Sequence, residues 1–173
     1  DFWGRIRRLS EAANADYLGQ EAARQAVVLT LIGSVATSYI QLRELDSRLE
    51  MARRTLDARK ESERLAQLRF KAGVISEMEL RQAGSELQGT AFSVQQLEQD
   101  VAQKENELCL LLGRNPGPVK RGRSVDTLLI PAVPAGLPSE LLARRPDIQQ
   151  AEQTLVAANA RVGAAKANFF PSI

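Results

Sequence analysis

The side chains able to do chemistry are few in this chain, and they are not arranged for catalysis. The 173 residues contain no histidine and a single cysteine, Cys109. The commonest general base and the commonest metal ligand are therefore missing. Cys109 lies in the apolar run 108–112, where a small buried hydrophobe is the ordinary interpretation and a reactive thiol is the alternative. A lone cysteine forms neither an internal disulfide nor a zinc site by itself.

Two groups of charged residues remain as candidates for chemistry. The acidic group is Glu61, Glu63, Glu77 and Glu79, and the basic group is Lys120, Arg121 and Arg123. Carboxylates on a helical surface are ordinary ion-pair partners, and no cleft is evident that would raise a pKa. The basic group predicts a solvated loop, with phosphate binding as the weaker alternative. We therefore predict that the chain is not an enzyme and holds no cofactor or metal.

Two apolar series with seven-residue spacing dominate the middle of the chain. The first comprises Val28, Val35, Leu42, Leu49 and Leu56, with Leu31, Leu45 and Ala52 three places on. The second comprises Leu80, Leu87, Val94, Val101 and Leu108, with Ala83, Leu97 and Leu111 three places on. Such seams let two helices pack lengthwise. Residues equidistant from Gly73 pair apolar with apolar, so the sequence predicts a long antiparallel α-helical hairpin.

The turn between the two series has clear local chemistry. Gly73 can take the left-handed conformation that ends a helix. Ser76 and Glu79 form a capping box for the second helix, with Ile75 and Leu80 as a hydrophobic staple. The first helix is expected to begin within the first dozen residues and to end near Phe70. The second helix is expected to end near residue 112. In the first helix, the apolar row is expected to shift after residue 56 to Ala58, Leu65 and Leu68.

The last third of the chain has a different texture. Residues 113–138 are rich in proline and glycine, which predicts an irregular connection with one short strand at 128–130. A short helix is expected from Pro138 to Arg144. A third long helix begins at Pro146 and ends near Asn168, and its many alanines predict close packing against neighbouring helices. The predicted division is 1–112 for the hairpin, with its tip near 70–76, 113–145 for an irregular segment with a short helix, and 146–173 for the third helix.

Charge and hydropathy argue against two further classes of protein, those that bind nucleic acid and those with membrane-spanning helices. With 23 basic and 21 acidic residues the net charge is +2, which gives no general attraction to nucleic acid. The longest apolar stretch, 26–40, is interrupted by glycine, serine and threonine, so no segment is expected to cross a bilayer. The opening residues are not expected to form a signal peptide, and both ends are expected to be cut from something larger.

Several motifs resemble those of one family, the outer-membrane efflux proteins. They are DFWGR at 1–5, RFKAGVIS at 69–76, LLLGRNPG at 110–117 and LPSELL at 137–142. The most specific are RRPDI at 144–148, the alanine-rich stretch 157–167 and FFPSI at 169–173. Together they are similar to OprM-like (NodT-type) channel lipoproteins of the TolC superfamily, and the resemblance runs through the whole chain in order.

The resemblance implies a fold and a place in the cell. Family members are trimers with a β-barrel in the outer membrane and a long α-helical barrel in the periplasm. This chain would be the first periplasmic hairpin plus half of the equatorial region of a Gram-negative outer-membrane protein, with 146–173 leading toward a missing membrane strand. As such a segment it would depart from the family by lacking the acylated N-terminal cysteine, the membrane strands and the second hairpin, so its membrane contact would come only through those missing parts.

The resemblance also implies partners and a site. The tip would dock a periplasmic membrane-fusion adaptor, and an inner-membrane RND pump would supply the energy. The positions that match the family's docking tip are Arg69, Phe70, Gly73, Val74, Ile75 and Ser76. Ile32, Ala36 and Tyr39 lie off the main seam, so a freestanding chain is expected to self-associate or lose order.

Heptads alone also permit a non-channel coiled-coil scaffold or a periplasmic adaptor protein. Adaptors flank their hairpin with lipoyl-like strands, whereas the flanks here read as helical and rich in proline and glycine, which disfavours that alternative.

Overall fold

The computed structural model describes residues 1–122, 132 and 138–171, and within them the chain forms helices and no strand. The helices are α1 (Arg5–Lys71), α2 (Glu77–Leu111), α3 (Pro138–Arg144) and α4 (Pro146–Ala167). Contacts group the chain into two compact units, one of Asp1–Gly33 with Pro131–Ile173 and one of Ser34–Ile130. The predicted all-α fold is confirmed, and each unit is built on one antiparallel pair of helices.

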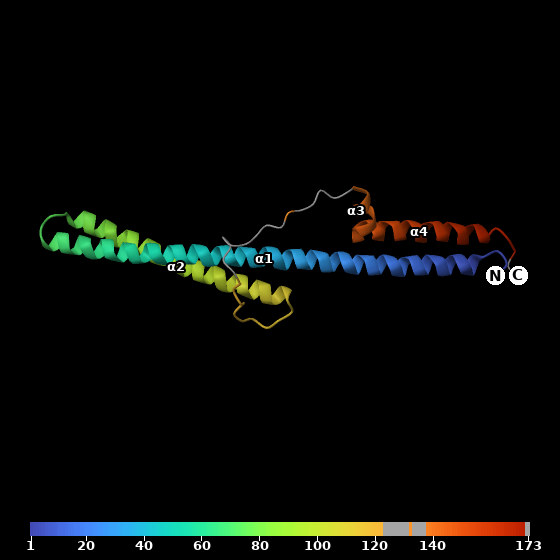
Figure 1. Ribbon diagram of the computed structural model, residues 1–173, viewed down its shortest axis with the longest axis horizontal. Coiled ribbons are helices and arrows are strands. Elements are labelled where there is room, and N and C mark those ends of the chain that lie inside the picture. Colours follow the sequence, from blue (N-terminus) through green and yellow to red (C-terminus); the bar gives the residue numbers. More distant parts are fainter. Residues whose placement is uncertain (123–131, 133–137, 172–173) are drawn as a thin grey trace. The chain divides into compact units, whose positions relative to one another are not determined.

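The unit Ser34–Ile130 is the predicted hairpin, in which α2 runs back along the C-terminal half of α1 (Figure 1). Two helices alone bury only the stripe that each turns to the other. The buried apolar residues of this unit are Leu42, Leu49, Val94, Leu108 and Cys109. All except the cysteine are heptad positions, so the seam read from the sequence is the observed seam.

Polar contacts between α1 and α2 report the register of the hairpin. Ser38 Oγ donates a hydrogen bond to Glu107 at 2.8 Å, and Arg59 pairs with Glu86 at 2.5 Å. In both pairs the partners lie almost equally far from Gly73 along the chain, as predicted. The ion pair is nearly half exposed and contributes at most about 1 kcal/mol. The apolar seam therefore supplies most of the packing free energy.

The seam keeps its heptad spacing to the tip, which corrects one expectation. Leu65 and Leu68 are 42% and 50% exposed, whereas Glu63 and Ala66 are half-buried. The predicted shift of the row to Ala58, Leu65 and Leu68 is therefore wrong. Helix geometry decides which positions face α2, even where the residue at such a position is charged. The two leucines are consequently left outside the seam.

The seam also begins later than predicted. Val28 and Leu31 are 44% and 42% exposed. Because α2 ends at Leu111, opposite Val35 in the hairpin register, it offers these two residues no partner. The first heptad series is thus longer than the helix that packs on it.

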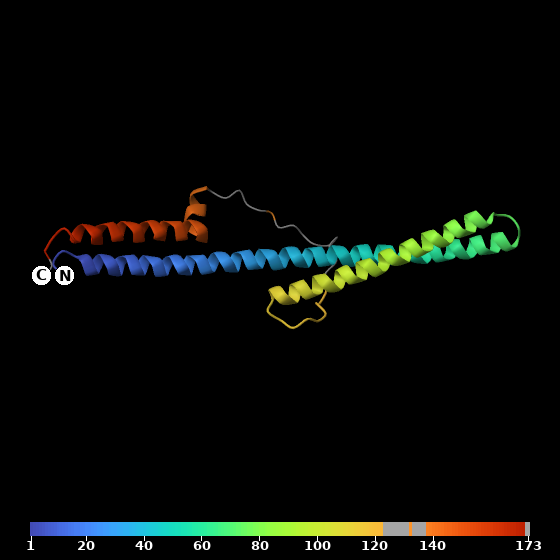
Figure 2. The ribbon, with the colours of Figure 1, turned by 180° about the vertical axis from the view of Figure 1, so that it is seen from behind.

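The unit Asp1–Gly33 with Pro131–Ile173 pairs the N-terminal part of α1 with α4, again antiparallel (Figure 2). Arg161 and Asp16 form an ion pair at 2.5 Å across the two helices. The buried residues of the pair are almost all alanines, namely Ala12, Ala15 and Ala22 on α1 with Ala157, Ala160, Ala164 and Ala167 on α4. Small side chains let helix backbones approach closely, so many weak contacts replace a few large side chains.

The close packing predicted for α4 is confirmed on one face of the helix. Ala158 and Ala165, on other sides of α4, are exposed. Alanine occurs on every side of α4, so periodicity alone could not select the buried side. Gly19 is buried, and a Cβ there would lie 3.6 Å from Gln153 Cβ, which shows that α4 approaches α1 closely at this position. At Gly33 a Cβ would meet nothing within 4 Å among the described residues.

The ends of the helices and the burial of Cys109 agree with the predictions. All four helices end within a residue or two of the expected positions. Cys109 is buried, and its Sγ donates to Gly117 O at 3.4 Å. The strand expected at 128–130 lies outside the described residues.

One stretch of α1 is more apolar than the interruptions by glycine, serine and threonine indicated. An 18-residue window of α1 is long and apolar enough to cross a membrane, and 11% of it is buried. Val27, Leu29 and Ile32 are each 60% exposed or more. Length and composition alone do not make a span, because a helix with neighbours on several sides has the same composition.

Candidate functional site

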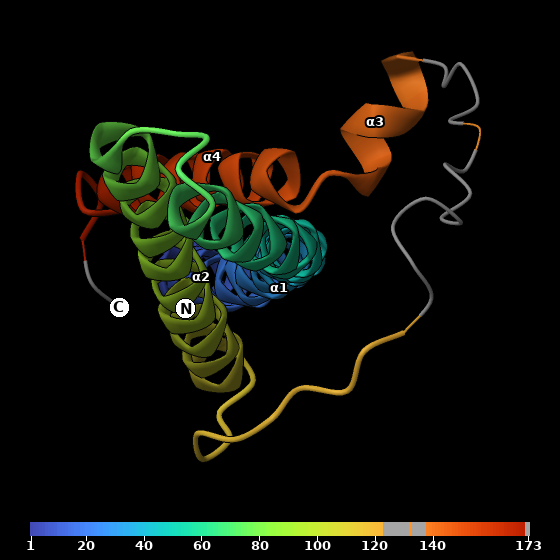
Figure 3. The same cartoon turned by 90° about the vertical axis from the view of Figure 1, so that its left-hand side faces the viewer.

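The tip of the hairpin is the turn between the end of α1 and the start of α2, which faces the viewer in Figure 3. Val74 N donates to Arg69 O, and Gly73 N donates to Phe70 O, both at 2.9 Å. These two bonds define a Schellman motif. Gly73 has a φ of 73°, a conformation that costs other residues about 1–2 kcal/mol. The predicted role of Gly73 in ending the helix is confirmed.

A capping box at Ser76 starts α2 on the other side of the turn. Glu79 N donates to Ser76 Oγ at 3.3 Å, and Ser76 N donates to Glu79 Oε2 at 2.8 Å. The box satisfies two backbone donors that a helix start leaves open, and such a cap contributes about 1 kcal/mol. The turn therefore has a defined backbone from either side.

The structure brings the predicted docking residues together at this turn. They are Arg69, Phe70, Gly73, Val74, Ile75 and Ser76. Gly73 and Ser76 shape the backbone, and Ile75 is half-buried. Val74 and Phe70 are 71% and 39% exposed. A Cβ on Gly73 would meet nothing within 4 Å, so the surface at the turn is open.

Further apolar side chains close to the turn are exposed. Met78 was not singled out from the sequence, and Leu65 and Leu68 were assigned to the seam. Leu65, Leu68 and Met78 are 42%, 50% and 77% exposed. With Phe70 and Val74 they form what we call the tip apolar set. Continuing the heptad row past residue 56 would have shown that the two leucines lie outside the seam. Large apolar side chains gathered at one exposed end are typical of a contact surface.

The acidic residues around the turn are engaged locally, as predicted. Glu61 pairs with Arg64 at 2.6 Å and Glu77 with Arg81 at 3.0 Å, each within one helix. The hydrogen bond from Arg64 lowers the pKa of Glu61. In the part of the chain that the structure describes, no three His, Cys, Asp or Glu side chains are grouped to hold a metal ion.

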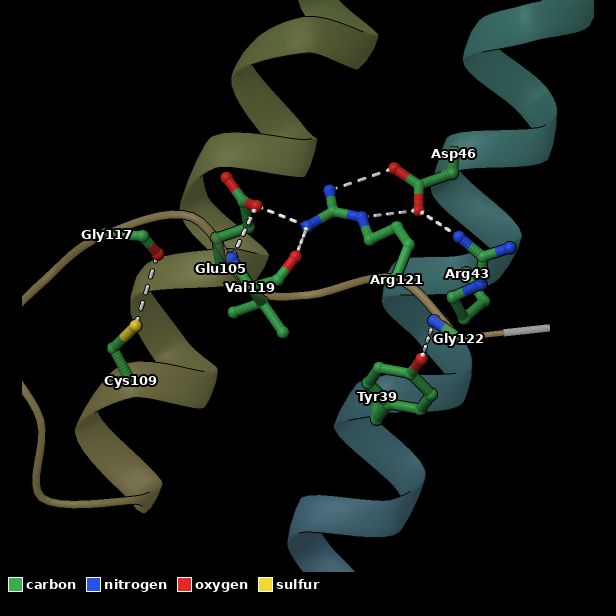
Figure 4. A network of polar contacts seen from close by, with 9 residues as sticks. All are labelled: Tyr39, Arg43, Asp46, Glu105, Cys109, Gly117, Val119, Arg121 and Gly122. Carbon is green, nitrogen blue, oxygen red and sulfur yellow. Dashed lines mark hydrogen bonds and ion pairs between the residues drawn. The ribbon is translucent and has the colours of Figure 1, made fainter. Parts of the chain in front are cut away.

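A second site is a network of polar contacts that attaches the loop after α2 to both helices of the hairpin (Figure 4). Arg121 Nε and Nη2 donate to the two oxygens of Asp46 at 2.9 and 3.0 Å. Nη1 of the same side chain donates to Glu105 on α2 and to Val119 O at 2.7 Å. Asp46, on α1, also pairs with Arg43 at 3.0 Å. We call Arg43, Asp46, Glu105 and Arg121 the loop clamp.

Backbone contacts extend the clamp along the loop. Val119 N donates to Glu105 Oε1 at 3.1 Å, and Gly122 N donates to Tyr39 OH at 2.7 Å. Tyr39, expected to lie on an unpartnered flank, therefore accepts a hydrogen bond from the loop. The clamp holds the segment 117–122 against the hairpin.

The electrostatics of the clamp favour its charged form. Burial, the largest influence on Glu105, disfavours its charge, but hydrogen bonds from Arg121 and Val119 outweigh burial and lower the pKa of Glu105. The hydrogen bond to Asp46 is the main cause of a raised Arg121 pKa. Both groups therefore stay charged through the neutral range.

The clamp corrects the interpretation of the basic group as a solvated loop. The Arg121 side chain is 28% exposed and is engaged by two carboxylates, so it offers little to a free phosphate. Lys120 is exposed, and Arg123 lies outside the described residues. No local pattern joins Arg121 to Asp46, 75 positions away, so spacing could not have revealed the clamp.

Comparison with known proteins points to one family. The sequence model of the outer membrane efflux protein family matches residues 1–114 and 137–173. Toluene efflux pump outer membrane protein TtgC of Pseudomonas putida is 40% identical over 174 residues, covering all of this chain and 36% of the relative. Cation efflux system protein CusC of Escherichia coli (strain K12) is 38% identical over 175 residues, covering all of this chain and 38% of the relative.

Solved structures agree with the sequence comparison. A CusC structure superposes with a TM-score of 0.87 at 36% identity, covering 98% of this chain and 40% of that one. The outer-membrane channel OprN gives a TM-score of 0.86 at 36% identity, covering 96% and 38%. The chain thus spans between 36% and 40% of the length of these proteins.

Proposed function

The chain belongs to the outer membrane efflux protein family, and we propose from this membership that it forms part of the periplasmic wall of an efflux channel. The relatives are named as outer-membrane and efflux-system proteins, and no catalytic role is assigned to this chain. Relatives named for toluene, antibiotics and cations share the same segment. The proposed role is therefore that of a conduit, without selectivity for one cargo.

The pattern of exposed apolar side chains carries the proposal. Each helix pair buries only its facing stripe, and large apolar residues remain on other sides. In the unit Ser34–Ile130 these include Met51 and Phe92, each 68% exposed, and in the other unit Leu29 and Leu155, each 61% exposed. A wall of helices needs a neighbour on each side of every hairpin, and such side chains supply contacts to it. The proposed neighbours are the rest of a longer channel protein and two further copies in a homotrimer.

We further propose that the hairpin tip docks a periplasmic membrane-fusion adaptor, with an inner-membrane RND pump supplying energy. The tip apolar set supports this role, because the capping box and the Schellman motif already stabilise the turn without those side chains. An apolar contact surface at a defined turn suits a partner that meets the end of the hairpin.

A chimeric channel tests the wall function. The 174-residue segment of TtgC that aligns with this chain is replaced by it, and the chimera is expressed in Pseudomonas putida lacking TtgC. We expect trimers in the outer membrane and restored survival in toluene. The same chimera with Leu42→Glu should fail to assemble, because Leu42 is fully buried in the seam. A chimera that assembles and inserts normally but restores no survival would contradict the proposal.

A further inference from the structure

Arg69 and Lys71 are the basic residues of the last turn of α1, directly before the tip turn. Both side chains are exposed, and neither forms an ion pair or a side-chain hydrogen bond within the part of the chain that the structure describes. Every other lysine and arginine that α1 and α2 carry in the unit Ser34–Ile130 contacts a carboxylate. The unpartnered cations of the hairpin helices are thus gathered at the tip.

The sequence explains why these two cations lack a local partner. A basic side chain on a helix meets a carboxylate most easily three or four positions away. The positions three and four residues before Arg69 and Lys71 are 65–68, which are all uncharged, and α1 ends at Lys71. Between 65 and 76 the chain has no carboxylate at all, so the pairing that is repeated along the rest of the hairpin stops here.

The carboxylates on either side of this segment are engaged elsewhere. Glu61 and Glu77 pair with arginines of their own helices. Glu63 is half-buried and accepts a hydrogen bond from Gln67. Glu79 is held by the backbone N–H of the capping box. None of these side chains compensates the charge of the last turn of α1.

The end of α1 itself gives the two cations only a weak local role. Basic residues in a last turn are favoured by the helix macrodipole, an effect that salt screens at an exposed site. The last carbonyls are already satisfied, since Leu68 O accepts from Ala72 N at 3.1 Å and Arg69 O accepts from Val74 N at 2.9 Å. The dipole therefore makes cations tolerable at this position without supplying a counter-charge.

The cations alternate with exposed apolar side chains of the tip apolar set. Leu68, Phe70 and Val74 are 50%, 39% and 71% exposed, and Arg69 and Lys71 lie between them in the chain. A partner that covers the apolar side chains must also remove water from the cations. Covering them with an apolar surface would leave two charges without compensation, which is unfavourable. Carboxylates on the partner would remove this penalty and steer the approach.

We propose that the surface which meets the hairpin tip carries carboxylates that pair with Arg69 and Lys71. This acidic surface presupposes the docking proposed above and adds to it the chemistry of the partner, an apolar centre with acidic residues beside it. A folded protein fits better than a free anion, because a free anion would leave the apolar side chains in water. The backbone of the turn is also fixed from both sides, which suits a partner with an equally fixed pattern.

The rate of association and its dependence on salt test the proposal. The TtgC chimera is purified as a trimer, and its binding to the membrane-fusion adaptor of the same efflux system is followed by surface plasmon resonance. Charges act over about 10 Å in about 0.1 M salt and over about 3 Å in about 1 M salt. Arg69→Gln combined with Lys71→Gln should slow association about ten-fold at the lower salt concentration and change it little at the higher one.

Two control variants separate charge from structure. Lys120→Gln removes an exposed cation that has no ion pair with a described residue and that lies in the loop after α2, so it should leave the association rate unchanged. Arg69→Lys combined with Lys71→Arg keeps both charges and should retain the rate and its salt dependence. Circular dichroism verifies that each variant keeps its helix content.

The outcomes distinguish the acidic surface from docking itself. Equal association rates for the chimera and its double glutamine variant at the lower salt concentration would overturn the acidic surface. Docking would still stand in that case if Val74→Glu weakened binding at both salt concentrations. Loss of binding by the variant that keeps both charges would also overturn the acidic surface, because shape rather than charge would then be recognised. A trimeric chimera that does not bind the adaptor at either salt concentration would refute docking, and the acidic surface with it.

Discussion

Arg121 and Asp46, 75 positions apart in the sequence, meet through two parallel hydrogen bonds, Nε to Oδ2 at 2.9 Å and Nη2 to Oδ1 at 3.0 Å. Because the same guanidinium also donates to Glu105 on α2, one side chain connects the loop to both helices of the hairpin. A forked, charge-assisted contact of this kind is stronger and more directional than a single surface ion pair.

Replacing Arg121 should therefore destabilise the hairpin. We expect Arg121→Ala to lower the free energy of unfolding by about 1–3 kcal/mol, because Asp46 and Glu105 lose a partner in a partly buried place. Arg121→Lys should recover only part of the loss, since an ammonium cannot make the fork. Urea unfolding followed by circular dichroism measures both. Arg54→Ala, on the exposed surface of α1, is the control, and equal midpoints for the two alanine variants would refute the clamp.

The clamp also predicts a pH dependence with a definite sign. The pKa of Glu105 is lowered in the folded chain, so its ionised form stabilises the fold. This contribution is complete above the unfolded pKa of about 4.3 and is lost as pH falls through the lower folded value. The Tm difference between the natural chain and Glu105→Gln should therefore be largest near neutral pH and should shrink below about pH 4. If the difference persisted unchanged into that acidic range, the charge of Glu105 would not be what stabilises the fold, and the pH prediction would be contradicted.

The hairpin could be predicted from the sequence because its determinants are local or periodic. Gly73 fixes the turn, Ser76 and Glu79 fix the helix start, and the heptads fix the facing stripe. The predicted shift of the row to Leu65 and Leu68 failed because polarity was given more weight than helix geometry. Leucines outside the seam were consequently mistaken for seam residues, although they are better explained as part of the tip apolar set.

Contacts between distant segments could not be predicted in the same way. The pairing of α4 with the start of α1 depends on alanines and Gly19, which carry almost no directional pattern in the sequence. The loop clamp depends on four charged residues from three segments, among many charged residues that form only local ion pairs. A single sequence does not say which of them meet.

The close approach at Gly19 can be tested by side-chain size. A Cβ at this position would be in ordinary contact with Gln153, so Gly19→Ala should be neutral or should stabilise α1 by up to about 1 kcal/mol. Gly19→Leu should destabilise by about 1–3 kcal/mol, because the larger side chain must push α4 away. Thermal unfolding by circular dichroism compares the two. Gly33, where a Cβ has open space, is the matched site, and Gly33→Leu should show no such loss.

The exposed apolar side chains of α1 predict self-association of the chain in isolation. Val27, Leu29 and Ile32 are 67%, 61% and 60% exposed, and association would remove this area from water. Size-exclusion chromatography with light scattering should show oligomers, and replacing all three residues with glutamine should shift the population toward monomer. A folded chain that stays monomeric at every concentration would contradict the prediction.

Docking at the hairpin tip is tested most directly by export through the TtgC chimera carrying Val74→Glu. Val74 is 71% exposed at the turn, so the substitution adds charge to the tip apolar set without removing a buried contact. Gln95→Glu, at an exposed position along α2, is the matched control for a new exposed carboxylate. We predict that Val74→Glu abolishes survival in toluene while trimers form and insert normally, and that Gln95→Glu retains both assembly and export. Full export by Val74→Glu would contradict docking at the tip.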